Sequence, residues 1–244
     1  MLGGFVLNTT EFHVDFAVIE GSPIDEVAFK NVIEKSKGIS ANNSNALCLA
    51  VKRFFDIVLS SLGCVILSPL FLILMLIVKL SDGGKVFYRH ERLGKNGKRI
   101  YIYKFRSMRQ NSDNELTDEQ LGILKKEFKL HDDPRVTKVG AFLRRTSMDE
   151  LPQLINIIKG DLSITGPRPI VFDELNFYGK DAAEFLSVKP GLTGYWQAYA
   201  RNNVTYSTGK RQKMELYYIR HRSLWFEIKI LFKTVISVFT KKGN

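Results

Sequence analysis

The sequence predicts an α+β, mainly helical fold that is anchored to one face of a membrane. Three observations support this: residues 57–78 form a 22-residue run without charge, basic residues dominate after residue 46, and short alternating or amphipathic segments occur elsewhere. The chain has 244 residues, a formal net charge of +11 and 45% hydrophobic residues. This composition is typical of a folded protein and excludes a mainly disordered one.

The first predicted part is a small acidic appendage and linker over residues 1–46. It holds three Lys and Arg residues against six Asp and Glu residues. Alternation over residues 12–18 predicts a short strand. Ser22-Pro23 predicts the start of a helix, Gly38 its end, and residues 38–46 a linker. No secretory signal is expected, because the start is not basic and acids interrupt it.

Residues 47–244 form the second predicted part, with 33 Lys and Arg residues against 19 Asp and Glu residues. A basic chain with one long apolar run favours an anionic membrane surface. No second run of that length exists in the sequence, which excludes a multi-span transporter. Two cysteines, Cys48 and Cys64, are too few for a disulfide framework or a Cys-based zinc site. A reduced compartment is expected.

The apolar run over about 57–78 predicts a helix broken at Ser68 and Pro69. A straight helix of this length covers about 33 Å, enough to cross the hydrocarbon core. Proline has no N–H and crowds the carbonyl four residues back, which predicts the break. Basic residues flank both ends, so both ends are expected on the cytoplasmic side. A re-entrant helix satisfies this condition, and a kinked span is the alternative.

Other segments give coarser expectations. Alternation predicts a strand over residues 100–108, and the polar residues 110–132 predict a helix or a loop. Residues 214–240 combine aromatic, aliphatic and basic side chains, which is typical of an amphipathic helix in the membrane interface. A core helix fits the same pattern equally well.

Adjacent carboxylates, Asp149 and Glu150, are the candidate catalytic groups. Pro152 is expected at the first position of a helix, so the pair enters a helix N-terminus, where N–H groups favour phosphate. Arg144, Arg145 and Arg168 lie nearby in sequence, and guanidinium groups match phosphate oxygens. A carboxylate that attacks phosphorus needs such cations and a second carboxylate for a divalent ion.

Simpler interpretations of the same residues stay open. Ser147 and Glu150 have the spacing of a helix capping box. Arg168 could lie on a rigid turn, and Lys104 and Arg106 on a solvated strand edge. The four histidines are too scattered in sequence for a metal site or a catalytic triad.

Taken together, the motifs resemble the monotopic phosphoglycosyl transferases, also called bacterial sugar transferases, from about residue 51 to the C-terminus. The blocks that carry the resemblance occur in this order: Lys52-Arg53-Phe54-Phe55-Asp56, Ser68-Pro69, Arg92-Leu93-Gly94, Lys104-Phe105-Arg106-Ser107-Met108, Asp133-Pro134-Arg135, Thr146-Ser147-Met148-Asp149-Glu150-Leu151-Pro152-Gln153, Lys159-Gly160-Asp161, Gly166-Pro167-Arg168-Pro169 and Pro190-Gly191-Leu192-Thr193-Gly194.

The resemblance implies transfer of a sugar 1-phosphate from a UDP-sugar to a polyprenol phosphate such as undecaprenyl phosphate. It implies that Asp149 attacks the β-phosphorus, releases UMP and forms a phosphosugar-aspartyl intermediate. It also implies that Glu150 binds Mg²⁺ and that Arg168 binds substrate phosphate, with Arg145, Lys104 and Arg106 as further candidates. The family's re-entrant helix is broken at a Ser-Pro pair.

The resemblance also implies a place in the cell and a set of partners. We expect the first membrane step of exopolysaccharide, capsule, O-antigen or glycoprotein glycan assembly, at the cytoplasmic face of a bacterial inner membrane rich in anionic lipid. A homodimer is left open, and no nucleic-acid partner is expected. Residues 1–46 do not match the family, and His90 stands where many relatives have Gln. The transferred sugar is not predicted.

Two other functions fit the charge pattern. A non-enzymatic monotopic scaffold that binds anionic lipid needs the same basic and apolar segments, but it does not need Asp149, Glu150 and Arg168 together. Nucleic-acid binding would use the basic residues, but the apolar run argues against it.

Overall fold

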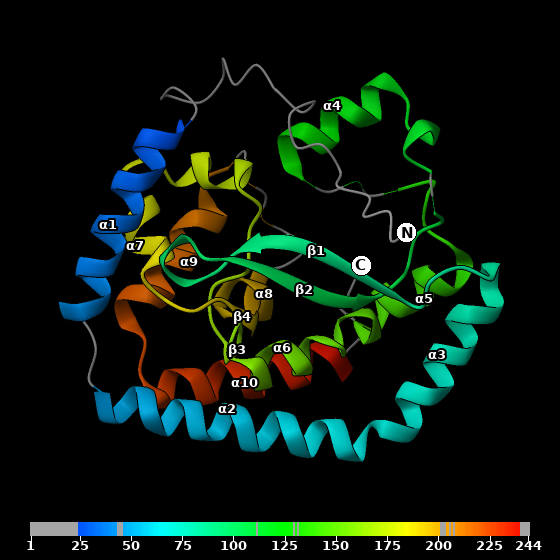
Figure 1. The fold of residues 1–244 in the computed structure, drawn as a ribbon, viewed down its shortest axis with the longest axis horizontal. Helices are drawn as coiled ribbons and strands as arrows, with labels where there is room; N and C mark the ends of the chain where they lie inside the picture. Colours follow the sequence, from blue (N-terminus) through cyan, green and yellow to red (C-terminus); the bar gives the residue numbers. More distant parts are fainter. Residues whose placement is uncertain are drawn as a thin grey trace, which may run out of the picture.

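The computed structural model describes residues 24–42, 46–110, 112–128, 130, 132–200, 204, 206 and 208–239. It confirms a mainly helical fold with short strands (Figure 1). The helices are α1 (Glu26–Asn42), α2 (Ala46–Ile66), α3 (Ser68–Asp82), α4 (Asp118–Glu127), α5 (Lys138–Arg145), α6 (Gln153–Lys159), α7 (Ala182–Leu186), α8 (Tyr195–Ala200), α9 (Lys210–His221) and α10 (Leu224–Phe239). The strands are β1 (Phe87–Leu93), β2 (Arg99–Phe105), β3 (Ser163–Thr165) and β4 (Gly191–Thr193).

A long antiparallel hairpin, β1 and β2, crosses the middle of the molecule (Figure 1). Its second strand agrees with the strand predicted over residues 100–108, although β2 ends at Phe105. Asn156 of α6 is fully buried and joins the helix to β2: its side chain donates to the carbonyl of Tyr101 at 2.7 Å and accepts from the amide of Tyr103 at 3.0 Å. These two hydrogen bonds fix α6, and therefore the turn before it, against the hairpin.

Helices α2 and α3 form one apolar segment that bends by 63° at a break next to Ser68-Pro69. The predicted break is therefore confirmed, and its cause is the missing N–H of Pro69, which lies in the first turn of α3. No described helix is by itself long and apolar enough to cross a membrane, whereas this bent pair meets the test of length and composition. Whether the pair re-enters or spans stays a prediction.

Three polar residues near the start of α2 hold it to the other helices and strands. Lys52 pairs with Glu227 of α10 at 2.5 Å, and Arg53 donates to the carbonyls of Ile157 and Ile158 at the end of α6. Asp56 is only 4% exposed and accepts bonds from Ser163 and from the amide of Ile164, at the start of β3. The basic residues before the apolar run thus also connect α2 to α10 and α6.

Helix α1 is longer than predicted. It continues past Gly38 to Asn42, so the predicted helix end at Gly38 is wrong. The linker predicted over 38–46 is wrong for residues 38–42 and for Ala46, which are helical, and residues 43–45 lie outside the described residues. Tertiary contacts outweigh the glycine: Ser40 is buried and its hydroxyl donates to the carbonyl of Ser187 and to Asn96. The predicted strand over 12–18 and the helix start at Ser22-Pro23 lie outside the described residues.

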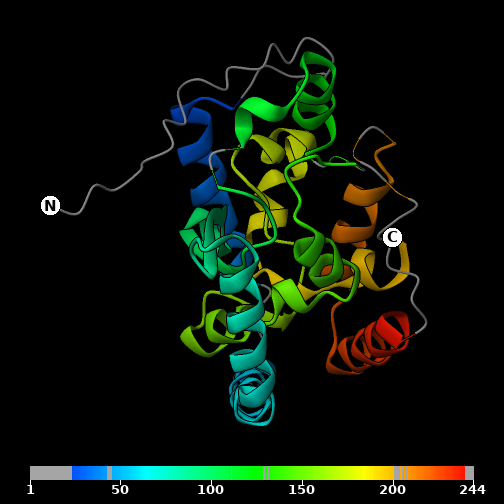
Figure 2. The ribbon, with the colours of Figure 1, turned by 90° about the vertical axis from the view of Figure 1, so that its right-hand side faces the viewer.

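The C-terminal region divides into two helices with different surroundings. Helix α9 contributes buried residues to the core, including Leu216 and Ile219. Helix α10 has an exposed apolar face, with Trp225 65% exposed and Phe232 70% exposed. Each alternative for residues 214–240 therefore describes part of the segment: α9 is a core helix, and α10 presents an apolar face outward. Figures 1 and 2 place α10 and α2 at the same lower edge of the molecule.

Candidate active site

The two candidate catalytic carboxylates lie on a 3₁₀ turn, Met148–Glu150, between α5 and α6. Ser147 has a φ of 56° and makes no side-chain cap hydrogen bond, so the capping box considered for Ser147 and Glu150 is not formed. Helix α6 begins at Gln153, one residue later than predicted, with Pro152 as its N-cap. Asp149 is 7% exposed.

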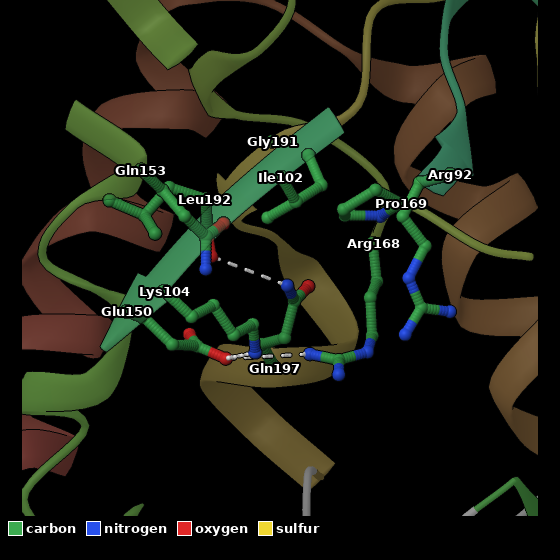
Figure 3. A pocket seen from close by; sticks show the side chains of 10 residues that line it. All are labelled: Arg92, Ile102, Lys104, Glu150, Gln153, Arg168, Pro169, Gly191, Leu192 and Gln197. Carbon is green, nitrogen blue, oxygen red and sulfur yellow. Dashed lines mark hydrogen bonds and ion pairs between the residues drawn. The ribbon is translucent and has the colours of Figure 1, made fainter. Parts of the chain in front are cut away.

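Glu150 faces two cations across a small pocket (Figure 3). Lys104 of β2 binds the Glu150 Oε1 atom at 2.9 Å, and an Arg168 guanidinium nitrogen lies 3.9 Å from the same oxygen. All three side chains are between 14% and 29% exposed, so solvent and a ligand can reach them. The residues that line the pocket are Arg92, Ile102, Lys104, Glu150, Gln153, Arg168, Pro169, Gly191, Leu192 and Gln197.

Close backbone pairing positions the segment that carries Arg168. The amide of Gly166 donates to the carbonyl of Thr193, and the amide of Gly191 donates to the carbonyl of Pro167, both at 2.9 Å. A Cβ on Gly166 would lie 2.6 Å from the Gly191 nitrogen, so only glycine permits this approach. The two motif blocks around Gly166 and Gly191 therefore form one structural unit at the pocket wall.

Behind Arg168 lies a group of buried charged residues, Glu174, Arg211 and Glu215, here called the inner charge cluster. Glu215 is fully buried and accepts the Arg168 amide hydrogen at 3.2 Å. Arg211 lies between the rings of Trp196 and Tyr206, 4.3 and 4.0 Å from their centroids, and 3.8 Å from Glu174. Burial raises the pKa of Glu215 to about 7, although the positive charge of Arg211 opposes this.

Positive charge dominates the pocket. Glu174 pairs with Arg92 at 3.2 Å, and Arg92 in turn lies 3.0 Å from the His90 Nδ1 atom. The pKa of His90 is lowered to about 3, first by burial and then by the charges of Arg92, Lys104 and Arg168. His90 is therefore neutral at neutral pH, and an anionic ligand would meet guanidinium and ammonium groups in the pocket.

The structure separates the predicted site residues into two sets. Glu150, Lys104 and Arg168 share the pocket, whereas Arg106 and Arg145 do not line it. Arg106 is buried in an ion pair with Asp82 at the end of α3, and Arg145 is exposed in the last turn of α5.

The predicted nucleophile also lies apart from the lining residues. Asp149 is not one of them, although it precedes Glu150 in the same turn. The neighbouring arginine that acts on Asp149 electrostatically is Arg144, and its Nε atom donates to Ser107 at 2.9 Å. Burial lowers the pKa of Arg144, and the charge of Asp149 opposes this effect.

Sequence reasoning did not assign Arg92, Gln153 or Gln197 to the site, yet all three line the pocket. Each lies in or next to a motif block that was noticed: Arg92-Leu93-Gly94, Leu151-Pro152-Gln153 and the segment after Pro190. The signal was therefore present, but nothing in the linear sequence showed that these blocks converge.

The residues present fit Mg²⁺ that arrives with a phosphorylated substrate. Among the described residues, no group of three or more His, Cys, Asp or Glu side chains could hold a metal ion by itself. Mg²⁺ is usually held by one or two carboxylates, with substrate phosphates and waters completing its shell. Glu150, which lines the pocket, can supply such a carboxylate.

A pocket in which several cations converge on one carboxylate is typical of a protein class: enzymes that act on phosphate-bearing substrates. The amino-acid sequence identifies the family within that class. Residues 47–241 match the family model of the bacterial sugar transferases, and the chain belongs to this family. It is therefore a transferase of the phosphoglycosyl transferase type.

Relatives with assigned names support this membership. The chain is 46% identical over 199 residues to the exopolysaccharide production protein ExoY of Sinorhizobium fredii, covering 79% of this chain and 87% of that protein. It is 47% identical over 200 residues to the undecaprenyl-phosphate galactose phosphotransferase of Salmonella typhimurium, and 41% over 199 residues to the UDP-glucose:undecaprenyl-phosphate glucose-1-phosphate transferase of Escherichia coli. These alignments cover 79% of this chain but only 41% of either protein.

Proposed function

We propose that this protein transfers a sugar 1-phosphate from a UDP-sugar to a polyprenol phosphate and releases UMP, as an early step of surface polysaccharide assembly. The observation that carries the proposal is the convergence of Lys104 and Arg168 on Glu150 in a pocket that Arg92 also lines. Three cations suit a diphosphate. The lipid carrier is proposed from the names of the Salmonella and Escherichia relatives, which contain undecaprenyl phosphate.

In the first proposed step, an oxygen of the Asp149 carboxylate attacks the β-phosphorus of the UDP-sugar. A new aspartyl O–P bond forms, the P–O bond to UMP breaks, and UMP leaves with the electron pair. Lys104, Arg168 and Arg92 bind the diphosphate oxygens and stabilise the charge that develops on them. Because only 7% of Asp149 is exposed, substrate binding has to widen the access to its carboxylate.

In the second proposed step, a phosphate oxygen of the polyprenol phosphate attacks the phosphorus held on Asp149. The aspartyl O–P bond breaks, the carboxylate is restored, and the product is a polyprenyl diphosphate sugar. Glu150 would hold Mg²⁺, which supplies charge neutralisation on the phosphates when bound. Addition of EDTA should therefore abolish turnover, and Mg²⁺ should restore it.

Replacement of the nucleophile tests this function. Asp149→Asn should lower single-turnover UMP release at least about 10³-fold, because removal of a nucleophile eliminates the covalent step. Asp161→Asn is the matched control, since Asp161 pairs only with the exposed Lys98 among the described ion pairs. Near-normal turnover by Asp149→Asn would contradict the covalent role. A panel of UDP-sugars in the same assay identifies the donor.

We further propose that the bent α2–α3 pair re-enters the cytoplasmic face of the inner membrane. The basic residues at both ends of the pair and its 63° bend support this topology. With Cys48 and Cys64 replaced, single cysteines at Ala50 and Lys85 should both react with an impermeant thiol reagent only from the cytoplasmic side. Labelling from opposite sides would show a kinked span instead. Pro69→Ala should shift labelling towards that spanning pattern.

A further inference from the structure

A groove between α8 and α10 has no part in the steps proposed above. It is lined by Tyr199 of α8 and by Trp225, Ile228, Lys229, Phe232 and Lys233 of α10, and its volume is about 430 Å³. Apolar side chains form most of its surface, and the rings of Trp225 and Phe232 are 65% and 70% exposed. Contiguous exposed apolar surface marks a site that binds an apolar partner.

Two lysines border this apolar surface. The Lys229 ammonium lies 5.6 Å from the ring centroid of Trp225, and that of Lys233 lies 5.7 Å from the ring centroid of Tyr199. Within the part of the chain that the structure describes, neither lysine has a carboxylate partner. A groove with apolar walls and two positive charges matches an amphiphile that has a hydrocarbon chain and one anionic head.

The groove lies next to the catalytic pocket and at the edge of the molecule that carries the apolar helices. Helix α10 and α2 share that lower edge in both views (Figures 1 and 2). Gln197 of α8 lines the catalytic pocket, whereas Tyr199, two residues later, lines the groove. Residues two apart point to different sides of a helix, so α8 is a shared wall about 10 Å thick.

The chemistry of the groove selects one occupant. A UDP-sugar is polar and matches the catalytic pocket, not an apolar groove. A phospholipid would contact an exposed apolar helix, but the enzyme does not consume it. We propose that this groove is the docking site of the polyprenol phosphate acceptor, with the first isoprene units against Trp225, Ile228 and Phe232 and with Lys229 and Lys233 attracting the phosphate before the head group moves past α8 to the pocket. This inference rests on the proposed function, because that function defines the acceptor.

A binding experiment tests the groove without turnover. A polyprenyl phosphate with a diazirine on its first isoprene units is photolysed with the full chain in neutral-lipid nanodiscs, and labelled peptides are mapped by mass spectrometry. Labels should lie on residues 225–233, and unlabelled polyprenyl phosphate should compete for them. Labels elsewhere, or equal competition by phosphatidylglycerol, would overturn the inference.

Kinetics of matched variants give the second test. Phe232→Ala should raise the KM for polyprenyl phosphate about tenfold and much more than the KM for the UDP-sugar, because part of the acceptor contact is lost. Val235→Ala is the control, since Val235 is 53% exposed on α10 but does not line the groove. Equal effects of both variants would indicate general membrane contact and overturn the inference.

The two proposals fail in different ways. If the wild-type protein releases no UMP from any UDP-sugar, the proposed function fails, while the photolabelling still tests the groove. If UMP is released normally but Phe232→Ala leaves the acceptor KM unchanged, the groove inference is wrong and the proposed function stands.

Lys229→Gln combined with Lys233→Gln should raise the acceptor KM in the same way as Phe232→Ala.

Discussion

In the α2–α3 pair, apolar side chains face outward, whereas behind Arg168 charged side chains face inward. Leu72, Leu76 and Leu80 of α3 are 59% to 74% exposed, while Glu174, Arg211 and Glu215 of the inner charge cluster are at most 6% exposed. Each region departs from the usual distribution of residues in globular proteins. The exposed apolar side chains of α3 therefore need an apolar environment around the helix. The buried charges of the inner charge cluster need pairing with one another.

The two regions also differ in what they position. The inner charge cluster holds the backbone of Arg168 and the side chain of Arg92, so it acts through contacts on the pocket that Glu150 lines. The inner side of α3 packs on the core through Leu74 and Val78, next to Phe105 and Leu143. Its outer side is exposed in the part of the chain that the structure describes. The sequence pattern of α3 is thus explained only in part by packing.

The largest expected effect comes from breaking the inner charge cluster. Glu215→Leu should destabilise the protein by about 3–5 kcal/mol, because the buried Arg168 amide loses its acceptor and the buried Arg211 guanidinium loses a polar neighbour. Glu215→Gln keeps an acceptor for that amide and should cost much less. Denaturant unfolding in detergent measures both variants. Equal costs would show that the hydrogen bond to the Arg168 amide does not matter here.

The next effect separates the two sides of α3. Leu74→Ala should destabilise the fold by about 2–5 kcal/mol, because Leu74 is 3% exposed in the core. Leu76→Ala changes a side chain that is 59% exposed, so it should leave the unfolding free energy nearly unchanged. On the proposed membrane placement it should lower vesicle partitioning about tenfold. Unaltered partitioning by Leu76→Ala would contradict that placement.

A smaller effect concerns pH. Glu215 has a folded-state pKa of about 7, above its ordinary value of 4.5, so the folded state binds its proton more tightly than the unfolded state. The stability that this provides is fully present below about pH 4.5 and is lost as the pH rises through about 7. Glu215→Gln should show a weaker loss of thermal stability than the wild type between pH 5 and pH 8. Parallel pH profiles would contradict the raised pKa.

The smallest effect is expected at His90. Because burial and neighbouring cations lower its pKa to about 3, His90 is neutral at neutral pH in the free protein. His90→Gln, which introduces a neutral side chain that can accept from Arg92, should change the KM for the UDP-sugar by less than about threefold. A loss of a titration near pH 6.5 from the rate profile would show that His90 is ionised after all.

Much of the architecture was predictable because it depends on local chemistry. Pro69 dictates the break between α2 and α3 wherever the segment lies, and the alternation before Phe105 dictates a strand. Gly38 does not end the helix because Ser40, two residues later, bonds to Ser187, which is far away in sequence. This contact outweighs the local preference of glycine. Local signals fail where long-range packing contributes more free energy.

The candidate site was predictable in composition but not in arrangement. The sequence by itself determined the family, the carboxylate pair at residues 149–150 and the concentration of positive charge after residue 46. Only the tertiary structure decided that Lys104 and Arg168 meet at Glu150, that Arg106 instead pairs with Asp82, and that Arg144 interacts electrostatically with Asp149. The physical reason is that side-chain direction depends on helix and strand packing, whereas residue type and spacing depend on the chain alone.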